Sequence, residues 1–353
     1  MKKIALLLTA VFAIATQSQA TIRRVNNTPG ISSVFNSLNT AIDAANPGDT
    51  IHIEGSVTAY GSPYITKRLV IIGPGFFHTD TAANLNTQAN MLGAYAEPIL
   101  GPGSKGSVIQ GMGLGSVTVS DSFITLQRNL ISGTVNLGSA GNSYGDTIRN
   151  NFFNGGAINN TSATYQVKGL FIYNNLIVKD VNTFMNVTIL PNTSGYFVNN
   201  SMTTVSSTNA IAISVQNFTF QNNIFNRVNF GTSSNPNGYQ GANIFLNNIA
   251  KAGLPTGNNN ISNIDPVDIF VGWNSPGTST YSTDARYKLK ATSPALNAGV
   301  LNGAAVDCGA FGGPAPYTLS GMSPVPSVYQ LSMPTQVNSG TPSISVSVGA
   351  ASH

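Results

Sequence analysis

The stretch Ile172-Tyr173-Asn174-Asn175 decides the fold, because its pattern of one apolar residue, one variable residue and two asparagines recurs along the chain. The other copies are Ile148-Arg149-Asn150-Asn151, Phe197-Val198-Asn199-Asn200, Phe220-Gln221-Asn222-Asn223 and Phe245-Leu246-Asn247-Asn248. The first asparagines fall at positions 150, 174, 199, 222 and 247, so the steps are 24, 25, 23 and 25 residues. A period of this size is typical of stacked repeats, in which residues at equal offsets from each pair lie on the same side.

Each repeat predicts a strand, a bend and a second strand. Leu170, Ile172 and Asn174 share one parity, and period-two alternation indicates a strand with one buried face. We therefore expect the first asparagine of each pair to point inward and to stack on its equivalents. This predicted ladder consists of Asn150, Asn174, Asn199, Asn222 and Asn247. The second asparagine is expected to take the left-handed backbone conformation of the bend.

Three further stretches agree with a stacked β fold. They are residues 40–55 (TAIDAANPGDTIHIEG), residues 65–75 (ITKRLVIIGPG), and residues 287–299 (YKLKATSPALNAG) followed by 307–312 (DCGAFG). They resemble the capping helix with the first coil, the second coil and the closing segment of secreted bacterial β-helix repeat proteins of the pectin-lyase-like superfamily.

The resemblance covers roughly residues 22–313. It implies an all-β fold, a right-handed parallel β-helix (a solenoid) with about 24 residues per coil, an N-terminal capping helix and a C-terminal cap like a β-hairpin. It implies no particular activity, since the superfamily contains lyases, hydrolases and non-catalytic surface proteins.

The chain is expected to divide into a signal peptide at residues 1–20, a β-helix domain at 21–313 and a C-terminal β cap or attachment segment at 314–353. Lys2-Lys3, an apolar run and Ser18-Gln19-Ala20 follow the pattern of a secretory signal. The apolar run is too short to span a membrane, and no later segment is long and apolar enough. We expect export and no transmembrane span.

Helical spacing over residues 33–46 predicts an amphipathic helix that covers the open end of the core, and regular coils are expected from Thr50 onward. Residues 78–106 interrupt the pattern and are expected to form a long excursion from one coil. Strands at 328–333 and 343–348 are expected to pair as a hairpin. This hairpin would close the far end of the solenoid or serve as a small export or attachment module.

Charged residues make up only 8% of the chain, well below the usual quarter. The net charge of +4 includes Lys2 and Lys3, so 14 basic and 12 acidic residues, or +2, remain without the signal. A balance this small indicates no nucleic-acid partner and suits a surface that meets neutral polymers. The single cysteine, Cys308, allows no internal disulfide and is expected to be a small buried residue.

The carboxylates are too dispersed for the usual catalytic groups of this fold. Hydrolysis needs clustered carboxylates, and calcium-assisted elimination needs an acidic metal site with a basic residue. Between residues 122 and 264 the only acids are Asp146 and Asp180. Their offsets from the nearest asparagine pairs place them on different sides of the solenoid, and Asp121 matches neither.

His52 and Glu54 share one strand face, and His78 and Asp80 begin the excursion. These side chains have the chemistry of metal ligands. Residues spaced two apart on an outer strand face are ordinary, however, so we expect neither a metal site nor another cofactor.

Basic residues show a more regular placement. Lys179 and Arg227 lie five residues after the first asparagine of their pairs, and Lys251 lies four after. This edge is expected to bind an acidic polysaccharide, to supply the base of a metal-independent lyase, or to consist only of solvated turn residues. The three alternatives stay open at this point.

The sequence thus favours an exported, cell-surface β-helix protein that contacts polysaccharide or another surface component without catalysis. One alternative is a metal-independent polysaccharide lyase. Another is a purely structural envelope protein.

Overall fold

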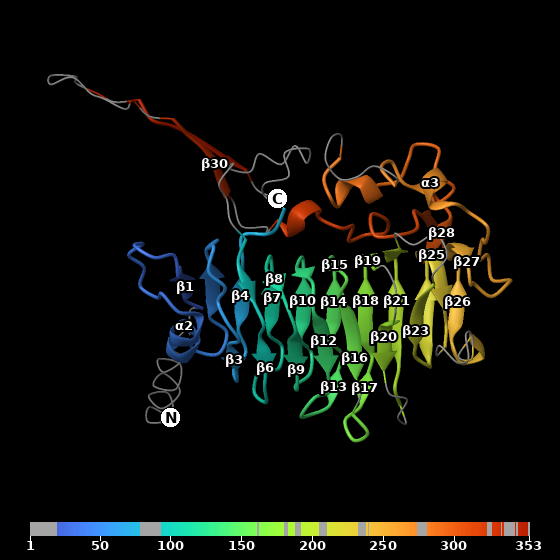
Figure 1. The fold of residues 1–353 in the computed structure, drawn as a ribbon, viewed down its shortest axis with the longest axis horizontal. Coiled ribbons are helices and arrows are strands. Elements are labelled where there is room, and N and C mark those ends of the chain that lie inside the picture. The colour runs from blue at the N-terminus through green and yellow to red at the C-terminus, as the bar shows by residue number, and fades with distance from the viewer. Residues whose placement is uncertain are drawn as a thin grey trace, which may run out of the picture.

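Successive coils of the chain stack along one axis into a parallel β-helix, and each coil adds strands to the same long sheets (Figure 1). The computed structural model describes residues 20–77, 93–160, 162–179, 183–187, 192–204, 210–231, 238, 240–273, 281–322, 327–332, 334, 343 and 345–351. The predicted solenoid with about 24 residues per coil is confirmed.

Sheet A holds the strands that precede the asparagine bends: β1 (Ile22–Val25), β2 (Thr50–Ile53), β4 (Val70–Ile72), β7 (Val108–Gln110), β10 (Thr125–Gln127), β14 (Thr147–Arg149), β18 (Leu170–Tyr173), β21 (Gly195–Val198), β24 (Phe218–Gln221) and β26 (Ile244–Leu246). Its ten strands pair in parallel, one coil to the next.

A second assembly of fifteen strands has two arms, called sheet B and sheet C here, which meet at β25 (Ile224–Asn229). Sheet C follows the bends and contains β5 (Tyr95–Ala96), β8 (Gly113–Leu114), β11 (Leu130–Ile131), β15 (Phe152–Asn154), β19 (Leu176–Val178), β22 (Ser201–Thr203) and β27 (Ile249–Ala252). Sheet B contains β3 (Tyr64–Ile65), β6 (Ile99–Leu100), β9 (Val117–Val119), β12 (Thr134–Leu137), β16 (Ala157–Asn160), β20 (Thr183–Val187) and β23 (Ile211–Ser214).

The sheets enclose an apolar core, to which each strand contributes the side chains at its inward positions. In sheet A the inward row includes Ile172, Phe197 and Phe220, all 0% exposed. Because the register is strictly parallel, like residues meet: the ring centroids of Phe197 and Phe220 lie 5.5 Å apart, and those of Phe220 and Phe245 lie 5.1 Å apart. Such aromatic stacking adds to the free energy of apolar burial along the whole axis.

The two asparagines of each pair have roles opposite to those predicted. The first one takes the left-handed conformation, with φ near 52° at Asn150, Asn174 and Asn199. The second one is 0% exposed and forms the ladder, as in Asn175 and Asn200. The prediction was wrong because a left-handed residue turns the chain sharply, so strand parity does not continue through it. The first asparagines Asn222 and Asn247 follow the same rule.

The ladder satisfies every hydrogen-bonding atom of the asparagine amide. Asn175 Oδ1 accepts hydrogen bonds from the backbone N–H and the Nδ2 of Asn151, at 2.9 and 3.1 Å. Asn175 Nδ2 donates to Asn200 Oδ1 and to the carbonyl of Ile148, both at 2.9 Å. The same contacts link Asn129, Asn151, Asn175, Asn200, Asn223, Asn248 and Asn260.

The first asparagines hold a returning segment, residues 299–322, called the strap here (Figure 1, orange to red). It starts with the hairpin of β28 (Gly299–Leu301) and β29 (Ala304–Val306) and ends with the short helix η4 (Leu319–Gly321). Asn222, Asn199, Asn174 and Asn150 donate, in that order, to carbonyls of Val300, Asp307, Ala310 with Gly312, and Ala315 with Pro316. The strap therefore runs back toward the N-terminal coils, one asparagine per coil.

The strap buries the outer face of sheet C and creates a second apolar core. Phe152, Leu176 and Ile224 face outward from the coils yet are at most 1% exposed. The strap backbone approaches sheet C closely, which explains the glycine at position 309 of the 307–312 motif. A Cβ on Gly309 would lie 2.5 Å from the Ile224 side chain. The expected burial of Cys308 is confirmed at 0% exposure, and burial raises the pKa of its thiol to about 12.

The N-terminal helix is confirmed but shorter than predicted, α2 (Leu38–Ala44), and β1 precedes it as an additional strand of sheet A. The predicted excursion over 78–106 was wrong in its second half, where the two-residue strands β5 and β6 belong to coils. Strands this short, flanked by Gly and Pro, carry little periodic signal. Residues 78–92 lie outside the described residues.

The predicted C-terminal hairpin exists as β30 (Ser327–Ser332) paired antiparallel with β31 (Ser347–Ala351). It does not close the far end. Because the strap ends with Ser320 accepting from Phe76 N and Met322 accepting from Arg128, the hairpin follows beside the early coils (Figure 1). The predicted boundary between 313 and 314 falls inside the strap.

The remaining short elements lie at the loops and at the far end of the coils. They are β13 (Ser143–Tyr144), β17 (Val167–Lys168), η2 (Gln240–Ala242), α3 (Pro266–Ile269) and η3 (Ala285–Tyr287).

The two asparagines of each pair have different roles, so substituting them should lower the free energy of unfolding by different amounts. Asn175→Ala leaves several buried partners unsatisfied and should lower the free energy of unfolding by about 3 kcal/mol or more. Asn174→Gly keeps the left-handed bend and loses only the two hydrogen bonds to the strap, so we expect about 1–2 kcal/mol. Urea unfolding followed by circular dichroism measures both. A larger cost for Asn174→Gly than for Asn175→Ala would contradict the assignment.

Candidate functional site

The outer face of sheet A presents two parallel rows of side chains, because alternate residues of each strand point away from the core. The outer row consists of Val108, Thr125, Thr147, Phe171, Tyr196, Thr219 and Ile244. The bend-side row, next to the asparagines, consists of Gln110, Gln127, Arg149, Tyr173, Val198, Gln221 and Leu246.

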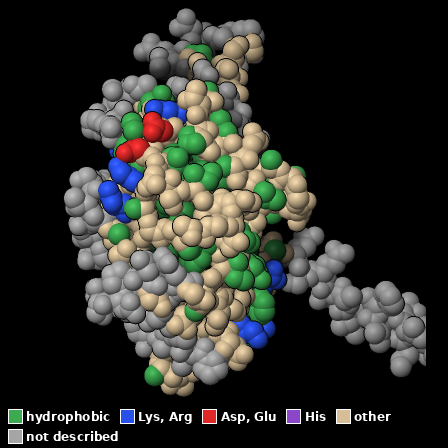
Figure 2. Space-filling view, turned by 90° about the vertical axis from the view of Figure 1, so that its right-hand side faces the viewer, with side chains coloured by type: hydrophobic (Ala, Val, Ile, Leu, Met, Phe, Trp, Pro, Cys, Tyr) green, Lys and Arg blue, Asp and Glu red, His purple; other side chains and the backbone are tan. Residues whose placement is uncertain are grey.

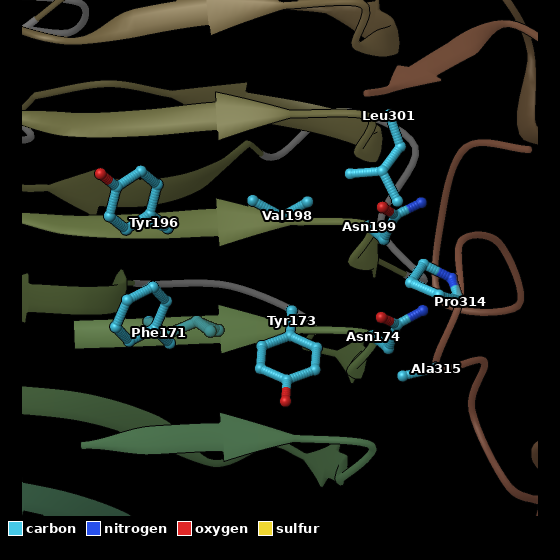
Figure 3. Close-up of a pocket in the computed structure, with 10 residues that line it drawn as sticks. Phe171, Tyr173, Asn174, Tyr196, Val198, Asn199, Leu301, Pro314 and Ala315 are labelled. Carbon is cyan, nitrogen blue, oxygen red and sulfur yellow. The ribbon is translucent and has the colours of Figure 1, made fainter. Parts of the chain in front are cut away.

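An apolar hollow of about 200 Å³ lies where aromatic residues of these rows meet the strap. Phe171 and Tyr196, neighbours on β18 and β21, stack with ring centroids 5.2 Å apart and an interplanar angle of 8°. Their side chains are 41% and 46% exposed. Figure 3 shows these rings on adjacent strands, with Pro314 of the strap across the hollow beside the bend asparagines.

A polar hollow of about 430 Å³ adjoins it along the same face and shares Pro314 and Ala315 of the strap. Its floor is a chain of hydrogen bonds: Arg149 Nε donates to Gln127 Oε1 at 2.7 Å, and Gln127 Nε2 donates to Gln110 Oε1 at 2.6 Å. Arg149 Nη1 also donates to the hydroxyl of Tyr173, at 3.2 Å. We call the two hollows together the sheet A groove.

Two guanidinium groups face the polar hollow, those of Arg128 and Arg149. Burial, and secondarily the positive charge of Arg149, lower the pKa of Arg128. Among the described residues that line the groove there is no Asp or Glu, and the described ion pairs involve neither arginine. An anionic group entering the groove would relieve the repulsion between these two cations and find N–H donors already positioned.

The structure does not bring the predicted basic edge together as one stripe. Lys179 Nζ donates to a backbone carbonyl of the preceding coil at 2.7 Å, and burial lowers its pKa. Arg227 pairs in register with Ala252, not with Lys251. Lys251 Nζ forms an ion pair with Asp265 at 2.6 Å. Figure 2 shows the end of the solenoid beyond β26, where acidic and basic side chains gather at one margin and further Lys and Arg side chains lie on the opposite side. A binding role for this edge stays a prediction.

The other side chains considered from the sequence lie apart from the groove. Asp121 accepts hydrogen bonds from the backbone N–H groups of Gly103 and Lys105, at 2.8 and 3.0 Å, and so stabilises a turn. Asp180, His78 and Asp80 lie outside the described residues. In the described ranges, no three His, Cys, Asp or Glu side chains form a group that could hold a metal ion. No helix of the described chain is long and apolar enough to cross a membrane.

Asp146 is a buried carboxyl at the start of β14, only 2% exposed. It accepts a hydrogen bond from the backbone N–H of Ile124 at 2.7 Å and another from the hydroxyl of Ser143. Burial raises its pKa from 3.8 to about 7. Because the carboxyl is enclosed by these partners, it supports the loop before sheet A and is not placed to meet a substrate.

The sequence-based interpretation missed the groove because it treated the bend-side position as variable. The available signal was the outward parity of Phe171 and Tyr196, which share one offset in consecutive coils. The strap contains no sequence repeat, so its place as a wall of the groove could not be predicted from the repeat pattern.

No protein-family model matches the chain, and comparison with curated proteins gives no match. Among solved structures, the chain is similar to pectate lyase Pel9A, with a TM-score of 0.35 and 13% sequence identity. The alignment covers 83% of this chain and 97% of that chain. This likeness assigns neither an activity nor a site residue to the chain.

The raised pKa of Asp146 predicts a pH-dependent stability. The folded state holds its proton up to about pH 7, whereas the unfolded state releases it near pH 3.8, so stability should fall as the pH rises through this window. Asp146→Asn is neutral and can keep both hydrogen bonds. At pH 8 it should therefore be more stable than the native chain by about 2–4 kcal/mol, with convergence near pH 4. Urea unfolding at both pH values measures this, and a less stable variant at pH 8 would contradict it.

Proposed function

We propose that the protein is an exported β-helix protein that binds an acidic polysaccharide in the sheet A groove and holds it without cleaving it. The main support is the stacked, exposed pair of Phe171 and Tyr196. An exposed aromatic face offers apolar contact to the C–H face of a sugar ring, while polar groups at its rim bind the hydroxyls. The groove combines this face with the glutamines and Arg149.

The charge of the groove supports an acidic ligand. Arg149 uses Nε and Nη1 in hydrogen bonds to Gln127 and Tyr173, which hold the guanidinium in place. Its remaining N–H groups suit a carboxylate, because a planar guanidinium matches two carboxylate oxygens. Arg128 faces the same hollow and adds a second positive charge.

The repeat geometry supports a polymer. Parallel strands lie about 4.8 Å apart, so equivalent side chains recur along the axis at a spacing comparable to one sugar unit. A polysaccharide lying along the axis would therefore meet Tyr196, Phe171 and then Arg149 on successive coils.

Binding without cleavage is favoured by the composition of the groove. Glycoside hydrolysis uses a pair of carboxyl groups on either side of the scissile bond. The described lining residues supply none. Export is proposed from the secretory pattern of residues 1–20, and an elongated polysaccharide-binding protein is suited to a cell surface.

Phe171→Ala with Tyr196→Ala should weaken binding at least about tenfold, or about 1.4 kcal/mol, because the stacking platform is removed. Ile244→Ala is the matched control: it lies in the same outer row, is 55% exposed and does not line the groove. Titration calorimetry with polygalacturonate and alginate oligomers measures the change. Equal affinity of the double variant and the control would refute the proposal, and unsaturated products absorbing in the ultraviolet would favour the lyase instead.

Arg149→Met keeps the length of the side chain and removes its charge. We expect it to weaken binding of acidic oligomers about tenfold, to reduce the salt dependence of binding and to leave any binding of neutral oligomers unchanged. Calorimetry at low and high salt measures all three effects. If acidic and neutral oligomers lose affinity equally, Arg149 acts on the shape of the groove and not through charge.

A further inference from the structure

Phe123 has a backbone conformation that its residue type normally avoids. Its φ is 60°, in the left-handed region. In four other coils the equivalent position, five residues before the left-handed residue of the bend, is also left-handed and is filled by residues that tolerate this conformation: Gly106, Gly145, Gly169 and Asn217, with φ between 61° and 77°. Ser194 and Ala242 occupy this position in two further coils without the left-handed conformation. Phe123 therefore takes this conformation at a cost that glycine would avoid.

Burial does not compensate for that cost. The side chain of Phe123 is 52% exposed. Its ring passes over Gly145, where an added Cβ would lie 2.8 Å from the ring, and Lys105 Nζ is 5.0 Å from the ring centroid. The Phe123 ring is exposed, lies beside a cation and is carried by a strained backbone. These properties suit a side chain that binds a ligand, not one that packs in the core.

The position of Phe123 connects it to the sheet A groove. Two residues later, Thr125 belongs to the outer row, which continues in register through Thr147 to Phe171 and Tyr196. From the coil of Phe123 to that of Tyr196 is three coil steps, or roughly 14 Å. Thr125 and Thr147 occupy the interval between the two aromatic platforms.

We propose that Phe123, with Lys105 beside it, forms an outer stacking subsite for the polysaccharide held in the sheet A groove. This inference rests on the proposed function and specifies how far along sheet A the bound polysaccharide extends. The ligand chain runs from Tyr196 and Phe171 across Thr147 and Thr125, and reaches Phe123 only when it is long enough. The occupant is an acidic polysaccharide, because the track passes Arg149, which lies on the same strand as Thr147, and ends beside Lys105.

The expected signature is a length-dependent affinity. An oligomer of about three sugar units covers the three coils of Tyr196, Phe171 and Arg149, which span two coil steps, and so stops one coil short of Phe123. Oligomers of about six units also reach Phe123 and should bind about tenfold more tightly to the native protein.

Phe123→Gly separates binding from folding. It relieves the left-handed strain, so the melting temperature should rise by about 2 °C. Affinity for the uronate hexamer should fall about tenfold, to that of the trimer, while trimer affinity stays unchanged. Phe123→Tyr is the matched control, because it keeps the aromatic face and should keep hexamer affinity.

Calorimetry with uronate trimers and hexamers, together with thermal unfolding, tests the inference. Equal hexamer affinity for Phe123→Gly and the native chain would overturn the outer subsite and leave the groove standing. A native protein that binds neither oligomer would overturn the groove and the subsite together.

Discussion

The whole structure depends on the hydrogen bonding of side-chain amides to backbone at the bends. Each ladder asparagine from Asn129 to Asn248 is buried and has both its oxygen and its nitrogen satisfied by the next coil or by its own sheet. A buried amide without partners is costly, so a coil that slips out of register by one residue loses these bonds at once. The ladder therefore fixes the register of sheets A and C, and with it the in-line rows on the outer face. The chain has no disulfide, so the asparagine ladder holds the coils in register in place of covalent cross-links.

The same bends supply a second set of contacts through the left-handed asparagines. Their side chains point away from the core and bind carbonyls of the strap, so one dipeptide serves both the stacking of coils and the docking of the chain end. The strap in turn buries the outer face of sheet C and forms the wall of the groove. A buried carboxyl supports its end: Asp284 accepts from Tyr317 OH at 3.1 Å and from Ser320 N at 2.6 Å.

The sequence was sufficient for the fold and insufficient for the site, for physical reasons. A period of 23 to 25 residues with alternating parity requires stacked strands, so the solenoid followed directly. The roles of Asn174 and Asn175 were exchanged because parity was extended through a left-handed residue. The groove was not predictable because its wall comes from contacts such as that of Asn150 with Ala315, which are 165 residues apart and mark no repeat. The outward aromatics Phe171 and Tyr196 were visible in the sequence, but without the strap their surroundings were not.

The direction of the strap has a consequence for the order in which the molecule forms. Coils can stack as soon as each neighbour is present, so the solenoid can grow from the first residues onward. The groove cannot, because its wall residues Pro314 to Pro316 and Thr318 follow all the coil strands in the chain. Arg128 Nη1 and the carbonyl of Met322, which meet at 2.9 Å, are separated by 194 residues, so this contact can form only after all the residues between them have been synthesised. A chain that stops before the strap therefore has the stacked sheets but lacks one wall of the groove.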